Sequence, residues 1–271
     1  MTVSSDPAPY VRLTAPLSSF IGREAELRQI VDLLNCSRLV TLTGPGGIGK
    51  TRLAWEATAR AANSVADGTF AVSLAHLQAA DQVAPAIMFA LGLKDSDDRS
   101  PVQTLAGSLC EQRQILLLDN FEHVLDAAPL VVDLLLACPA LRILVTSRTP
   151  LHIDGEQLFP VPPLELPLPD RSMSKVDIVR TDAITLFVQR TRQHTPDFSV
   201  TAENASTIAA ICHRLDGLAL AIELAAPQLR LFSPQAGPSA ATPDRRPAQP
   251  AGSPANDALN TGLEPRPLVT G

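Results

Sequence analysis

Aromatic side chains are scarce in this 271-residue sequence, at 4% of residues, although hydrophobic residues make up 45%. A core with so few rings has to be filled by alanine, leucine, valine and isoleucine. Lysine occurs only as Lys50, Lys94 and Lys175, so nearly all of the positive charge is arginine. The formal net charge of −6 argues against a broad basic face. We therefore expect a globular, aliphatic protein that does not itself bind nucleic acid.

Metal-binding cysteine pairs and membrane-length apolar runs are also absent. None of the four cysteines forms a CxxC pair, and no histidine stands at zinc-ligand spacing, which predicts buried, reduced thiols. Asp133 and Pro139 interrupt the longest apolar run, so no membrane span is predicted. Residues 1–10 lack the basic flank and apolar stretch of a signal peptide. These absences favour a cytoplasmic protein without membrane contact.

Short aliphatic strands alternate with amphipathic helices over the first 150 residues, which indicates a parallel sheet with helices on both faces. The predicted strands are residues 39–43, 69–74, 115–118 and 142–146. The predicted helices are residues 24–34, 50–62, 83–91, 102–112 and 122–137. Beyond Pro150, the five prolines of residues 158–169 predict an ordered connector. Further helices are predicted at residues 177–193, 202–215 and 218–231.

These patterns divide the chain into four parts. Residues 1–16 are polar and contain three prolines, so they predict a flexible N-terminus. Residues 17–160 form the predicted α/β domain, and residues 161–232 form a small helical lid domain. Residues 233–271 are dense in proline, alanine, glycine and serine and contain no aromatic residue. Because such a segment cannot bury enough surface to offset chain entropy, we expect it to be disordered.

A phosphate-binding loop is the strongest single signal in the sequence. The segment GPGGIGKT at residues 44–51 matches G-x-x-x-x-G-K-[ST], and a strand precedes it while a helix follows. Its glycines allow the backbone to approach phosphate oxygens, and its amides and the helix dipole attract anions. Lys50 is expected to reach the β- and γ-phosphates, and the Thr51 hydroxyl to bind Mg²⁺. The predicted nucleotide-binding residues here are Gly44, Gly46, Gly47, Ile48, Gly49, Lys50, Thr51 and Arg52.

Two later strand ends carry polar residues that suit the same site. The apolar strand at residues 115–118 runs into Asp119, which predicts a Mg²⁺ ligand, the alternative being a helix-capping aspartate. Glu122 either orients a water molecule or favours the start of a helix. Arg148 ends another buried strand and either senses the γ-phosphate or makes a surface ion pair. We take Lys50, Asp119, Glu122 and Arg148 as the candidate catalytic residues.

Four segments together resemble the nucleotide-binding region of STAND-class P-loop ATPases, in the NB-ARC-like branch found in bacterial LuxR-type or OmpR-like transcriptional regulators. These segments are LSSFIGRE at 17–24, GPGGIGKTRLA at 44–54, LLLDNFEH at 116–123 and GLALAIEL at 217–224. The strand end at residues 146–148 also fits the pattern, and the resemblance spans roughly residues 17–232.

The resemblance implies further site residues. It places Phe20, Ile21 and Arg23 on the adenine and ribose side of the nucleotide and makes Arg148 the sensor arginine. Gly217 and Ala219 match the Gly-x-Pro element, whose proline packs on adenine in the family. Ala219 stands in place of that proline here, which removes one rigid apolar surface from the predicted contact.

The function implied is a signalling switch that binds ATP or ADP with Mg²⁺, hydrolyses ATP slowly and works through protein partners or self-association. The alternative is a non-catalytic ADP-binding interaction module. A small-molecule kinase is disfavoured because no arginine-rich lid follows Arg148. Relatives in the family continue past this region, so the change in composition after Pro234 suggests a truncated or frameshifted product.

Overall fold

The computed structural model describes residues 18–94, 98–167 and 181–231. The predicted flexible N-terminus at 1–16 and the predicted disordered tail at 233–271 lie outside these ranges. The described segments up to residue 231 belong to one compact unit. The finer division into an α/β domain and a lid domain stays a prediction.

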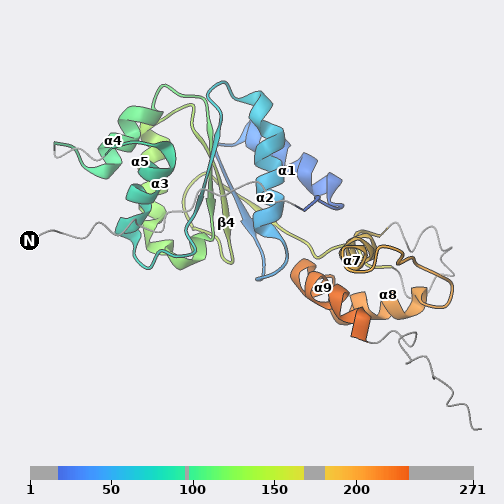
Figure 1. Ribbon diagram of the computed structural model, residues 1–271. Helices are drawn as coiled ribbons and strands as arrows, with labels where there is room; N and C mark the ends of the chain where they lie inside the picture. Colours follow the sequence, from blue (N-terminus) through green and yellow to red (C-terminus); the bar gives the residue numbers. More distant parts are fainter. Residues whose placement is uncertain (1–17, 95–97, 168–180, 232–271) are drawn as a thin grey trace, which may run out of the picture. The chain divides into compact units, whose positions relative to one another are not determined.

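A five-stranded parallel sheet lies between two layers of helices (Figure 1). Its strands are β1 (Leu39–Thr43), β2 (Thr69–Ser73), β3 (Ile115–Asp119), β4 (Arg142–Ser147) and β5 (Glu156–Pro160), in the order β2-β3-β4-β1-β5. All neighbouring strands pair in parallel. The predicted fold class is therefore confirmed. Because strands β3, β4 and β1 are neighbours, their carboxyl ends bring three loops to one edge of the sheet.

Helices cover both faces of the sheet (Figure 1). On one face lie α1 (Glu24–Cys36) and α2 (Lys50–Ala61), and on the other lie α3 (Val83–Leu91), α4 (Pro101–Leu109) and α5 (Ala128–Ala137). Side chains along a strand alternate between faces. Leu116 and Leu118 therefore pack with α3, α4 and α5, while Leu117 packs with α1 and α2. Short 3₁₀ turns occur at Ala62–Ser64 and Ala80–Gln82.

The helices after the sheet bury a core of their own. They are α7 (Asp182–Arg192), α8 (Ala205–Arg214) and α9 (Ala219–Ala225), and a 3₁₀ segment follows at Ala226–Leu231. Phe187, Cys212 and Ile222, one from each helix, are fully buried in this core. The part of the predicted 177–193 helix before residue 181 lies outside the described residues. No helix in the described ranges has both the length and the apolar character needed to cross a membrane.

Two predicted elements were wrong. The predicted helix at 122–137 is instead two 3₁₀ turns, Phe121–His123 and Leu125–Ala127, followed by α5. Asn120 adopts a left-handed φ of 62°, and Val124 leaves the helical region with φ −138°. The predicted connector at 158–169 begins inside strand β5, which sequence analysis missed. Only Phe159 is buried in that strand, and an edge strand tolerates Pro160, so the usual apolar signal is weak.

Candidate functional site

The loop between β1 and α2 turns sharply at the carboxyl edge of the sheet. Gly47 has φ +79° and Gly49 has φ +99°, backbone conformations that side chains other than glycine rarely adopt. A Cβ atom on Gly47 would lie 3.2 Å from the Leu220 Cβ. The Leu220 backbone N–H donates to the Gly47 carbonyl at 3.0 Å. Glycine is therefore required both by the turn and by the close approach of α9.

Lys50 opens α2 and its side chain folds back over the loop. The Nζ atom donates to the Gly44 carbonyl at 2.7 Å and to the Pro45 carbonyl at 3.2 Å. Burial lowers the pKa of Lys50, and the nearby Glu122 and Asp119 carboxylates counteract that shift. The ammonium group is thus held at the mouth of the loop, where a phosphate oxygen would meet it.

The next residue, Thr51, meets the end of strand β3. Its hydroxyl donates to the Asp119 Oδ1 at 2.7 Å, and the Thr146 hydroxyl donates to the same oxygen at 2.6 Å. The Asn120 backbone N–H donates to the Thr146 Oγ1 at 3.0 Å, which fixes the hydroxyl. Asp119 is only 2% exposed. Burial raises the pKa of this carboxyl group, and the two hydroxyl hydrogen bonds oppose the shift.

These oxygen atoms suit a magnesium ion. Mg²⁺ prefers hydroxyl, carboxylate, water and phosphate oxygens, and in nucleotide sites proteins commonly supply only one or two ligands. Thr51 and Asp119 provide one hydroxyl and one carboxylate beside the phosphate loop. Among the described residues no group of three or more His, Cys, Asp or Glu side chains converges. The chain therefore offers the sparse donor set of a metal shared with a phosphate.

Glu122 and Arg148 meet across the mouth of the loop. The Arg148 Nε lies 3.2 Å from the Glu122 Oε1, and the two side chains are 62% and 10% exposed, respectively. The second oxygen of Glu122 has no partner among the described residues. Glu122 lies in the 3₁₀ turn Phe121–His123 and not at the start of an α-helix. Arg148 does form an ion pair, and its partner is Glu122, itself a candidate catalytic residue. Both side chains line the same cavity.

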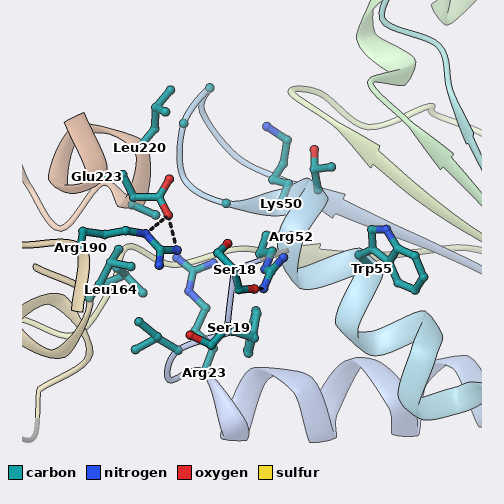
Figure 2. A pocket seen from close by; sticks show the side chains of 18 of the residues that line it. Ser18, Ser19, Arg23, Lys50, Arg52, Trp55, Leu164, Arg190, Leu220 and Glu223 are labelled. Atoms are coloured by element: carbon teal, nitrogen blue, oxygen red, sulfur yellow. Dashed lines mark hydrogen bonds and ion pairs between the residues drawn. The ribbon is translucent and has the colours of Figure 1, made fainter. Parts of the chain in front are cut away.

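Most of the predicted site residues line one cavity of about 530 Å³, seen in Figure 2. They are Phe20, Ile21, Arg23, Gly46, Gly47, Gly49, Lys50, Thr51, Arg52, Glu122, Arg148 and Ala219. The predicted residues outside that lining are Gly44, Ile48, Asp119 and Gly217. The Ile48 side chain packs in the core with α1 and α2. Gly217 has φ +64°, and its carbonyl accepts a hydrogen bond from the Leu164 N–H at 3.0 Å.

Arg23 connects separate segments of the cavity wall. Its Nη2 donates to the Ile48 carbonyl at 2.8 Å and to the Pro162 carbonyl at 2.9 Å. Its backbone N–H donates to the Asp182 carboxylate at 3.0 Å, at the start of α7. Burial lowers the pKa of this guanidinium group. These contacts show that Arg23 links the phosphate loop to the start of α7, a role that sequence reasoning did not anticipate.

Sequence reasoning also missed a second charged pair in the wall. The Arg190 Nε and Nη2 donate to the Glu223 Oε1 at 3.0 and 2.7 Å, which ties α7 to α9 (Figure 2). Both residues line the cavity, and the Arg190 Nη1 is buried without a partner among the described residues. The sequence signal for this pair was Arg190 itself, which follows the buried Phe187 by three residues and so lies on the apolar side of a predicted helix.

A parallel sheet whose interior strand β1 leads into a glycine-rich loop, with a lysine, a threonine and an aspartate gathered at its carboxyl edge, defines the P-loop NTPase fold. Two solved structures share this fold. The Walker-type ATPase of Pyrococcus abyssi aligns with a TM-score of 0.51 and 15% identity, over 79% of this chain and 69% of that protein. Cdc6p from Pyrobaculum aerophilum aligns with a TM-score of 0.53 and 14% identity, over 79% and 65%.

Curated relatives come from mycobacteria. An uncharacterized protein of Mycobacterium tuberculosis is 42% identical over 219 residues, 80% of this chain and 52% of that protein. Another protein of that species, provisionally named an HTH-type transcriptional regulator, is 43% identical over 203 residues, 74% of this chain and 21% of its own length. No family model matches the sequence. The chain thus spans about half the length, or less, of the curated relatives it matches.

Proposed function

We propose that the chain binds ATP or ADP with Mg²⁺ at the carboxyl edge of the sheet and acts as a nucleotide-dependent signalling switch of the STAND type. The observation that carries the proposal is the 2.7 Å hydrogen bond between the Thr51 hydroxyl and the Asp119 carboxylate beside the phosphate loop. This pairing brings together, from the first turn of α2 and the end of β3, the oxygens that would hold Mg²⁺. Bound Mg²⁺ would neutralise phosphate charge.

Each residue then has a role in binding. The amides of Gly46, Gly47 and Gly49 would surround the phosphates, because the turn leaves them at the mouth of the cavity. Lys50 would exchange its contacts with its own loop carbonyls for phosphate oxygens. Phe20 would pack beside the base or ribose, and the Arg52 guanidinium lies 6.0 Å from the centre of the Phe20 ring. This assignment follows the family resemblance.

The lid contacts support a switch rather than a static binding site. The backbone bond from Leu220 to Gly47 joins α9 directly to the phosphate loop. Arg190 and Glu223, from α7 and α9, close the other wall of the cavity. A nucleotide in the cavity would contact the loop and these helices at once. The presence or absence of its γ-phosphate could therefore favour different arrangements of the lid.

Slow hydrolysis is part of the proposal. Glu122 is the one candidate for orienting a water molecule, and its Oε1 pairs with Arg148 at 3.2 Å. A water molecule at that oxygen would have to compete with the arginine. The same observation favours the second candidate function, a non-catalytic ADP-binding interaction module. Phosphate release measured for the intact protein and for Glu122→Gln separates the two, because a binding module would show no turnover in either.

The role in transcription rests on a relative. The mycobacterial protein provisionally named an HTH-type regulator shares this region over 21% of its length. We infer that the chain corresponds to the nucleotide-binding part of such a regulator, acts in the cytoplasm, and works through protein partners or self-association. The net charge of −6 supports an absence of direct DNA binding by this chain.

Nucleotide titration tests the binding proposal directly. Lys50→Ala should weaken ATP binding at least tenfold in isothermal titration calorimetry, since the ammonium group supplies the only lysine charge at the loop. Lys94→Ala is the matched control, because Lys94 is exposed and does not line the cavity. Mass spectrometry of protein purified without added nucleotide should detect ADP. Equal ATP affinity in the two variants would exclude the phosphate loop as the binding site.

A further inference from the structure

Three arginines gather at the amino edge of the sheet, opposite the phosphate loop. Arg38 precedes β1, Arg113 lies two residues before β3, and Arg142 begins β4. These strands are neighbours in the order β3-β4-β1, so the fold brings the three residues to one place. They line a second cavity of about 500 Å³. Ser37 and Ser64 add hydroxyl groups to its wall.

Among the residues that the structure describes, no carboxylate forms an ion pair with these arginines. The ion pairs found in the described part of the chain involve other arginines, and none includes Arg38, Arg113 or Arg142. The Asp67 carboxylate accepts a hydrogen bond from the Arg113 backbone N–H at 2.6 Å and forms no ion pair with any of the three guanidinium groups. In a chain with 28 acidic and 22 basic residues, a cluster of unmatched cations is unexpected. Gathering like charges costs energy that a bound anion would recover.

Capping of helix ends explains only part of the cluster. Carbonyl groups at the ends of α1 and α5 face this edge, and arginines favourably contact such ends. The Arg38 Nη1 donates to the Leu135 carbonyl at 2.6 Å in this manner. The Arg142 Nη1 is buried and has no hydrogen-bond partner among the described residues. Arg142 is therefore left with an unused buried donor, and the exposed Arg113 side chain has no hydrogen bond to the part of the chain that the structure describes.

We propose that this edge is a second binding site, which takes a small multivalent oxyanion bearing phosphate or carboxylate groups. A guanidinium group presents paired N–H donors that match both kinds of oxyanion. A volume of about 500 Å³ falls within the range of small-molecule sites. The site is separate from the nucleotide cavity, with which it shares no lining residue. It does not depend on the proposed nucleotide function.

Calorimetric titration of the full chain with inorganic pyrophosphate tests the proposal. The wild-type protein should bind at two sites, the phosphate loop and the amino edge. Lys50→Ala should retain binding at the amino edge. The double variant Arg113→Gln/Arg142→Gln should bind pyrophosphate at least tenfold more weakly at the amino edge and keep its affinity at the phosphate loop. Arg99→Gln is the control, because Arg99 is an exposed arginine that does not line this cavity. Arg38 is left unchanged because it holds Leu135.

Citrate serves as the second probe and distinguishes the two ligand sources. Binding of citrate that is lost in the double variant would identify a general oxyanion site, and binding of pyrophosphate alone would identify a phosphate site. A single pyrophosphate site that disappears in Lys50→Ala would overturn the proposal, as would an unchanged titration of the double variant. If the double variant fails to fold by circular dichroism, Arg113→Gln alone gives the decision, since the Arg113 side chain is exposed. It should then weaken amino-edge binding severalfold, and an unchanged titration would again overturn the proposal.

Discussion

Replacement of Asp119 by asparagine separates the metal role of this residue from its structural role. Asparagine has the same shape and keeps a carbonyl oxygen for the hydroxyls of Thr51 and Thr146, which donate at 2.7 and 2.6 Å. Two charge-assisted hydrogen bonds become neutral ones, a loss of about 1 kcal/mol each. Removal of a charge from a site that is 2% exposed returns free energy of similar size. We expect the free energy of unfolding to change by no more than about 1–2 kcal/mol.

Nucleotide binding should respond much more strongly. Without the carboxylate, the increase in ADP affinity that Mg²⁺ gives should fall at least about tenfold, or ~1.4 kcal/mol. Calorimetry of ADP binding with Mg²⁺ and with EDTA measures that increase for Asp119→Asn. Asp126→Asn is the matched control, because Asp126 is exposed and outside the cavity. If Asp119→Asn keeps the full effect of Mg²⁺, the hydroxyl–carboxylate pair is not the metal site and our reasoning fails.

The remaining predictions concern Asp119 titration and the lid. Burial raises the pKa of Asp119, so the folded state favours its protonated form. The stability of the wild type relative to Asp119→Asn should therefore fall as pH rises from about 4. Urea denaturation of both proteins at pH 4–7 measures this difference, and a difference that grows with pH would contradict the prediction. Gly47→Ala should destabilise the protein by about 1–2 kcal/mol more than the same substitution at a site with negative φ. It should also destabilise more than Gly155→Ala, because Gly155 has the same φ of +79° but open space around it. Equal melting temperatures of the two variants would refute contact with Leu220. Arg190→Met should weaken ADP binding severalfold and change the melting temperature little, and an unchanged affinity would remove Arg190 from the binding site.

Local sequence patterns were sufficient for the central part of the fold. The apolar run at 39–43 and the glycine-rich loop after it are contiguous, so strand, turn and helix could be predicted together. Asp119 and Thr51 are 68 residues apart, and their meeting was predicted because carboxyl ends of parallel strands share one edge. Such predictions succeed where topology alone decides which residues meet.

Elements governed by longer-range packing were harder to predict. Strand β5 has one buried residue, Phe159, and its place beside β1 depends on an unpaired sheet edge that is not visible in its own residues. The break after Asp119 requires a left-handed backbone at Asn120, which the apolar pattern of the following residues conceals. The pair between Arg190 and Glu223 depends on the angle between α7 and α9. No local periodicity encodes that angle.

The hydrogen bond between Leu220 and Gly47 uses main-chain atoms on both sides, at 3.0 Å. Substitutions of the side chain at position 220 therefore leave this hydrogen bond in place, and alanine-scanning mutagenesis would not detect it. Proline alone lacks the N–H group and fits the first turn of a helix, so Leu220→Pro would detach α9 from the loop while sparing the helix. The connection between the two parts of the molecule is thus protected against nearly every single substitution at its donor.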